Sequence, residues 1–167
     1  MGLEQKLAEF FKLNDTTWQQ HANPWSVWTR LIILPLLTVA IWSRLWIGMY
    51  CWIPIVVVLF WTWVNPRAFG KPTTNKYWSS KSVMGERVWL NRKAIPIPSH
   101  HQKMILRLNV FTAFGLPLYV YGLYNFHLWT TVLGLLIIVG GKLWFLDRMV
   151  WLFEDLKNQE TYKDWLY

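Results

Sequence analysis

The 167-residue sequence is poor in cysteine and in charged residues. Cys51 is its single cysteine, which excludes a disulfide within the chain and a paired-cysteine metal site. Charged residues make up 16% of the chain, a low share for a water-soluble domain. The segment MGLEQKLAEFFKLND at the start has no apolar core and no small-residue cleavage site, so no cleavable signal peptide is expected.

Hydrophobic residues, by contrast, make up 54% of the chain and occur in blocks. The uncharged run from Leu45 to Val64 is long enough to cross a bilayer as one helix. Three more spans are predicted, from about Trp25 to Trp46, from about Leu108 to Tyr124, and from Leu128 onward. The 14 tryptophans suit the interfaces of a membrane, where one ring edge is dry and the N–H is wet. The predicted fold is therefore all-α, a four-helix transmembrane bundle.

Short connections pair these spans. Only Ser43–Gly48 separates the first two, and only Asn125–His127 separates the last two, so we predict two antiparallel hairpins with short interfacial helices. Kinks are expected at Pro35, Pro54 and Pro117, and close helix packing is expected at Gly134, Gly140 and Gly141. The single membrane domain, residues 1–167, then comprises an amphipathic N-terminal segment (1–22), the first hairpin (24–64), a basic loop (65–107), the second hairpin (108–147) and a tail (148–167).

The loop 65–107 carries nine Lys and Arg residues and one acidic residue, Glu86. By the positive-inside rule we expect the loop and both termini to be cytoplasmic and the protein to lie in the cell (inner) membrane. Within the loop, Ser79–Lys93 is predicted to be an interfacial helix. Its basic residues suit anionic lipid headgroups, and nucleic acid is disfavoured as a partner by the membrane context.

Several residues that can bind metals or transfer protons are expected at the cytoplasmic interface. The metal-ligand candidates are His21, Glu86, His100 and His101, and the catalytic candidates are Glu86, His100, His101 and Asp147. Adjacent residues such as His100 and His101 point about 100° apart on a helix, and the sequence has no HExxH motif. The alternative is that these histidines bond to headgroups and loop carbonyls. No cofactor follows from these patterns.

Charged residues near the ends of the spans form a second candidate group. A buried charge cluster is predicted from Arg30, Arg107, Lys142, Asp147 and Arg148, because charges near an apolar span usually face a partner inside the bundle. The cluster is either an ion-pair network that locks the helices or a substrate or proton site.

Four motifs resemble those of a family. They are HANPWSVWTR from His21, WVNPRAF from Trp63, GERVWLNR from Gly85 and WFLDRMVWL from Trp144. Together they are similar to an uncharacterised family of small prokaryotic integral membrane proteins, over about Ala22 to Asp155. The resemblance implies a compact membrane fold and carries over no activity and no catalytic residue.

The leading functional hypothesis is a non-catalytic accessory or scaffold subunit of a larger membrane complex or a homo-oligomer, because no catalytic signature accompanies the tryptophans and small residues. One alternative is a membrane-embedded, metal-dependent enzyme with a cytoplasmic-side His/Glu/Asp site. The other is a small oligomeric transporter.

Overall fold

The structure is a computed structural model that describes residues 15–163. Its elements in chain order are α2 (Asp15–His21), α3 (Pro24–Leu31), α4 (Ile33–Trp42), α5 (Arg44–Ile47), the 3-10 helix η1 (Gly48–Cys51), α6 (Trp52–Ala68), α7 (Trp78–Leu90), α8 (Ser99–Tyr124), α9 (Leu128–Leu156) and α10 (Glu160–Lys163). Within this range every element is helical, which confirms the all-α class. The amphipathic pattern expected around Leu3–Phe11 falls outside the described residues.

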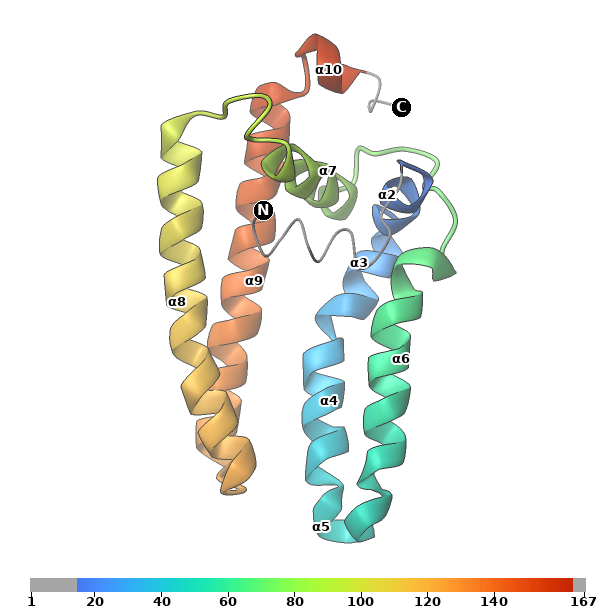
Figure 1. The fold of residues 1–167 in the computed structure, drawn as a ribbon, viewed down its shortest axis with the longest axis vertical. Helices are drawn as coiled ribbons and strands as arrows, with labels where there is room; N and C mark the ends of the chain where they lie inside the picture. Colours follow the sequence, from blue (N-terminus) through green and yellow to red (C-terminus); the bar gives the residue numbers. More distant parts are fainter. Residues whose placement is uncertain (1–14, 164–167) are drawn as a thin grey trace.

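The long helices form two antiparallel pairs that stand side by side (Figure 1). Helix α6 returns beside α4 after α5 and η1, and α9 returns along α8 after the turn at Asn125–His127. This second turn lies where the sequence places it, and Phe126 within it has a φ of 54°. At the other end, α7 packs on α9 and also contacts α3. We call this the polar end, and the opposite one the turn end.

Prolines shape the first pair differently from the prediction. The first span is broken at Ile32, because Pro35 has no N–H for the carbonyl of Leu31 and its ring crowds that carbonyl. Pro54 does not kink the middle of the second span. It lies in the first turn of α6, where a missing N–H leaves no helical bond unmade.

The uncharged run Leu45–Val64 is not one helix, contrary to the prediction. Its first part forms the end of α5 and η1, and Gly48 has a φ of 56°, which side chains other than glycine rarely adopt. Helix α6 begins only at Trp52 and continues to Ala68, with Pro66 in its last turn. The same apolar run therefore contains both the reversal of the chain and the returning helix.

Glycines bring α8 and α9 into close contact. A Cβ added at Gly134 would lie 2.4 Å from the Tyr119 nitrogen, and one added at Gly141 would lie 2.2 Å from Thr112 Oγ1. A Cβ at Gly140 would meet nothing within 4 Å. The close packing predicted at Gly134 and Gly141 is thus confirmed, and that at Gly140 is wrong because this position faces away from α8.

Helix α7 occupies nearly the predicted stretch Ser79–Lys93, and much of it is buried in the core. Its Val83, Met84 and Val88 are at most 1% exposed and belong to one hydrophobic cluster with α9. A Cβ at Gly85 would lie 1.9 Å from the Met149 carbonyl oxygen, so only glycine permits this approach. The main hydrophobic core therefore sits at the polar end.

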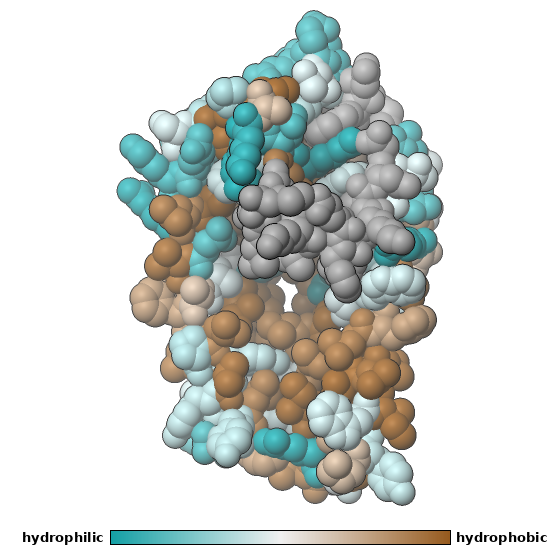
Figure 2. All heavy atoms as spheres, viewed as in Figure 1, coloured by the Kyte–Doolittle hydropathy of each residue, from teal (hydrophilic) through white to brown (hydrophobic). Residues whose placement is uncertain are grey.

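Charge and hydropathy divide the molecule along its length. Between Leu31 and Pro66 the chain has one charged residue, Arg44, and between Leu108 and Gly141 it has no Lys, Arg, Asp or Glu. Figure 2 shows the result as a hydrophobic lower half and a hydrophilic upper end. Three helical stretches are long and apolar enough to cross a membrane, namely Pro24–Ala68, which turns back on itself, Ser99–Tyr124 and Leu128–Leu156.

Few polar contacts join the two pairs in the apolar half. The hydroxyls of Thr38 and Tyr119 lie 2.8 Å apart, and Arg44 Nη2 donates to the carbonyl oxygen of Leu123 at 2.9 Å. The Arg44 guanidinium also lies 3.9 Å from the centre of the Phe126 ring. Figure 2 shows a narrow opening near mid-height.

Candidate functional site

The polar end brings together most of the residues that the sequence singles out, but in separate groups. His21 lies on α2, Glu86 on α7, His100 and His101 on α8, and Asp147 on α9. Three contacts organise them: His21 with Arg30, Glu86 with Lys142, and His101 with Asp155. Together these contacts decide which of the residues can bind a ligand.

His21 is occupied by Arg30. Nη1 of Arg30 lies against the imidazole nitrogens of His21, and Nη2 donates to the His21 carbonyl oxygen at 3.2 Å. Arginine can only donate, so the imidazole accepts as the neutral ring. Burial, and then the charges of Arg30 and Lys142, hold the pKa of His21 well below its usual value. His21 is therefore a hydrogen-bond acceptor here and is not grouped with the other histidines.

Glu86 is paired with a lysine. Lys142 Nζ on α9 donates to Glu86 Oε1 on α7 at 2.6 Å, and the same ammonium lies 4.6 Å from the centre of the Phe145 ring. Glu86 does not belong to the group of described residues whose ligand atoms converge. Its proposed roles as a metal ligand and as a partner of the histidines are therefore not supported by this arrangement.

The predicted buried charge cluster is not formed as one unit. Asp147 binds its neighbour Arg148 at 3.0 Å and accepts from Trp78 Nε1 at 3.4 Å. Lys142 binds Glu86, as described above. Arg107 is exposed on α8. Two of these contacts, Lys142 with Glu86 and Asp147 with Trp78, join α9 to α7. Arg30 binds His21 and also interacts electrostatically with Glu86.

Two Asn-Pro pairs form a hydrogen-bonded connection, buried at Asn65, that sequence reasoning missed. Ser26 Oγ donates to Asn65 Oδ1 at 2.9 Å, and Asn65 Nδ2 donates to Thr29 Oγ1 at 2.7 Å, with Ser26 and Asn65 fully buried. Asn23 caps α3 as predicted, accepting from the Trp25 N–H at 3.0 Å, and also donates to the Gly70 carbonyl oxygen. The repeated Asn-Pro pattern was the available signal. This connection fixes α3 against α6.

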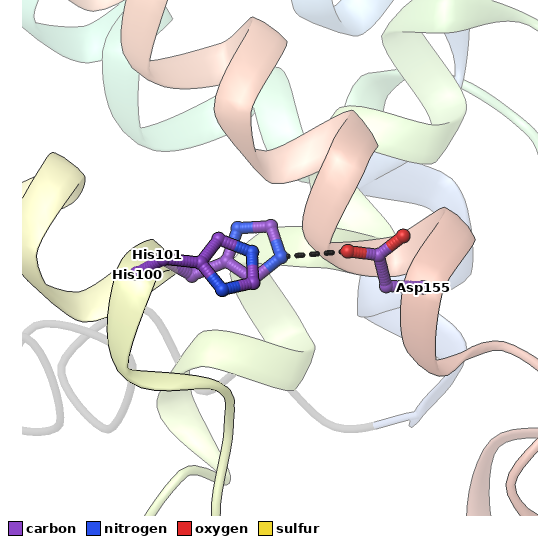
Figure 3. Close-up of side chains that lie close together, drawn as sticks. All are labelled: His100, His101 and Asp155. Atoms are coloured by element: carbon purple, nitrogen blue, oxygen red, sulfur yellow. Dashed lines mark hydrogen bonds and ion pairs between the residues drawn. The ribbon is translucent and has the colours of Figure 1, made fainter.

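The remaining group consists of His100, His101 and Asp155, shown in Figure 3. The histidines occupy the first turn of α8, and Asp155 occupies the last turn of α9. His101 Nε2 lies 2.9 Å from Asp155 Oδ2, and the two imidazole centres are 4.2 Å apart. His101 is 5% exposed, whereas His100 and Asp155 are open to solvent.

This group differs from the predicted one in a way that helix ends explain. The sequence places the start of the third span at Leu108, but α8 already begins at Ser99, directly after Pro98. His100 and His101 are therefore helical, and despite their angular offset one ligand atom from each lies within 4.8 Å of the other and of Asp155. Asp155 was not predicted, because the predicted hairpin covered only residues 108–147 and both helices extend beyond these bounds.

Comparison with known proteins gives a family and no activity. No curated protein and no solved structure matches the chain. A family model matches residues 2–166, nearly the whole sequence, and is described as a family of unknown function, DUF6653. The chain therefore belongs to this uncharacterised family, as the four motifs indicate.

Proposed function

We propose that the protein is an integral membrane protein whose two helix pairs cross the bilayer as antiparallel hairpins. The apolar half, in which Arg44 is the one charged residue, supports this, and so do the exposed tryptophans at its two boundaries. Trp46, Trp52 and Trp129 are 59–75% exposed near the turn end, and Trp25 and Trp144 are 70% and 48% exposed towards the polar end. Such aromatic belts mark the two interfaces of a membrane protein.

In this proposal the polar end faces the cytoplasm. The reason is the distribution of basic residues, because loop 65–107 has nine and the turn end has one, Arg44. Labelling with a membrane-impermeant maleimide tests it in a Cys51→Ser background. Lys93→Cys should react only after the cells are permeabilised, whereas His127→Cys should react in intact cells. The reverse pattern would show that the orientation is wrong.

Within the membrane we propose a non-catalytic role as a component that assembles with copies of itself or with another membrane protein. The observation that carries this is a stripe on α6 formed by Ile53, Val56, Val57 and Phe60, each 59–63% exposed. Their spacing of three and four residues places them on one helix face. Both α4 and α6 pack sparingly, with Ala40 the one buried residue of α4.

A hollow beside the first hairpin also supports assembly. It has a volume of about 1090 Å³ and is lined mainly by apolar residues, among them Ile41, Cys51 and Ile55, together with Arg44. In a bilayer, side chains or acyl chains fill such space, because voids forfeit dispersion contacts. A neighbouring helix packed on α6, with lipid acyl chains beside it, would fill this hollow.

Oxidative cross-linking tests the assembly. In a Cys51→Ser background, Val57→Cys places a thiol in the stripe, and Leu136→Cys, 64% exposed on α9, is the matched control. We expect cross-linking at residue 57 and not at residue 136. If copies of the chain pair with each other, purified protein in vesicles should give a cross-linked dimer. A heavier adduct that forms only in native membranes indicates another chain. Equal reactivity at both positions, or none, would contradict the proposal.

A further inference from the structure

The group of His100, His101 and Asp155 places three metal-binding donors where two helix ends meet (Figure 3). The imidazoles come from the start of α8 and the carboxylate from the end of α9. No two of the three ligand atoms are more than 4.8 Å apart. Two histidines and one carboxylate form a common donor set for zinc and for other divalent transition metals.

The surroundings of Asp155 supply an independent reason to expect a cation. Asp155 lies in the last turn of α9, where the helix dipole is negative and where this helix has no basic residue. The adjacent Glu154 is compensated by two lysines, Lys81 at 2.6 Å and Lys157. Among the described residues, Asp155 has His101 as its one ion-pair partner. The carboxylate thus remains short of positive charge.

A hydrogen-bonded His–Asp pair explains two of the three residues but leaves His100 unexplained. Within the described part of the chain, His100 makes no hydrogen bond or ion pair, although its ring lies against that of His101. The side chain is exposed and is free to point into water. Its position beside two other donors is what a shared ion requires.

We propose that His100, His101 and Asp155 bind a divalent transition metal ion of the zinc class, with water completing the coordination on the open side. Two atoms bound to one zinc are at most about 4.2 Å apart, twice the Zn–N distance. The 2.9 Å between His101 Nε2 and Asp155 Oδ2 meets this limit. The ligand atom of His100 lies within 4.8 Å of the other two, and a small rotation of this exposed side chain brings it within the limit. His101 carries its proton on Nδ1 when Nε2 binds the ion.

The ion would clamp the polar ends of α8 and α9. These helices are already held together by glycines in their apolar parts, whereas His101 with Asp155 joins their ends. An ion that binds only the folded chain raises its stability in proportion to the logarithm of its concentration. The site needs only the packing of α8 on α9, so it does not depend on the orientation or the assembly proposed above.

The test uses the full chain without a polyhistidine tag, purified in detergent and freed of metal with a chelator. Titration with Co²⁺ should give visible absorption bands that saturate near one equivalent, and added Zn²⁺ should abolish the bands and raise the thermal midpoint. His100→Ala is the informative variant because the side chain is exposed, so the fold should survive. We expect it and Asp155→Asn to weaken binding at least about tenfold.

His127→Ala is the matched control, because His127 is also an exposed histidine but lies at the turn end. It should bind Co²⁺ as the unmodified protein does. The proposal is overturned if the unmodified protein shows no saturable Co²⁺ bands, or if His100→Ala binds Co²⁺ and gains stability from Zn²⁺ unchanged. In either case His101 and Asp155 form only a structural pair.

Discussion

Single glycines set the distance between α8 and α9. We expect Gly134→Ala to destabilise the protein by about 1–3 kcal/mol, because the new methyl group overlaps the backbone of Tyr119. Gly140→Ala on the same helix is the control, since its Cβ meets nothing. That change should be neutral or stabilising by up to about 1 kcal/mol through helix propensity. Thermal or denaturant unfolding in detergent measures both. Equal effects would contradict the role assigned to Gly134.

His21 should make stability depend on pH. Because the pKa of His21 is lowered in the folded chain, the unfolded chain binds the proton more readily. The contribution of neutral His21 to the free energy of unfolding is fully present above the unfolded pKa of about 6.5. This contribution is lost as pH falls below that value. The thermal midpoint should therefore decrease from pH 8 to pH 5.

His21→Gln is the variant that tests this dependence, because glutamine keeps an acceptor for Arg30 and does not titrate. We expect a flatter profile of midpoint against pH, measured by the same thermal unfolding. His127→Ala should keep the steep profile. If the thermal midpoint of His21→Gln changes with pH as that of the unmodified protein does, another group causes the loss of stability in acid.

At the scale of elements, Arg44 connects the two hairpins at the turn end. Its guanidinium donates to the carbonyl oxygens of Leu123 and Tyr124, at the end of α8, where a cation is favourable. Arg44→Met should cost about 1.5–3 kcal/mol of stability, the range for hydrogen bonds to charged groups. It should also speed hydrogen exchange in η1.

Arg107→Met is the control for this change, because Arg107 is an exposed arginine of α8. It should leave both the stability and the exchange of η1 unchanged. Faster exchange in η1 for both variants would mean that general charge loss, and not the contact with α8, holds the turn end together.

Some elements could be predicted from sequence because a local residue decides them. Asn23 and Pro24 start α3, and the turn at Asn125–His127 lies between two apolar runs. Other features could not be predicted, because hydropathy does not separate a helix from a turn within one apolar run. The reversal at Gly48 inside the uncharged stretch is the clearest case.

The candidate site was partly predictable for a related reason. His100 and His101 can be selected as metal ligands from their chemistry alone. Their third partner, Asp155, is distant in sequence and becomes a neighbour only because α8 begins at Ser99 and α9 continues to Leu156. Glu86, the carboxylate proposed from the sequence, does not lie with the histidines, because the packing of α7 on α9 pairs it with Lys142.

At the scale of the whole molecule, the height of the apolar half matters for its fit to a bilayer. The uncharged part of α8, from Leu108 to Tyr124, is roughly 25 Å long at 1.5 Å per residue. The uncharged part of α9, from Leu128 to Gly141, is roughly 21 Å long. A typical bilayer core is about 30 Å thick. The uncharged lengths therefore match a hydrocarbon core thinner than the typical one.

We expect the protein, reconstituted in phosphatidylcholine vesicles, to have its highest thermal midpoint with short acyl chains and a lower one with long chains, because mismatch has a cost for each ångström. Arg107→Leu provides the matched variant. With the arginine removed, the uncharged part of α8 reaches back to Met104 and is roughly 31 Å long. The thermal midpoint of this variant should be highest at longer acyl chains, although Arg107 is exposed in the folded chain. An optimum in thick bilayers for the unmodified protein, or one that Arg107→Leu does not move, would show that the charged boundaries do not set its depth in the membrane.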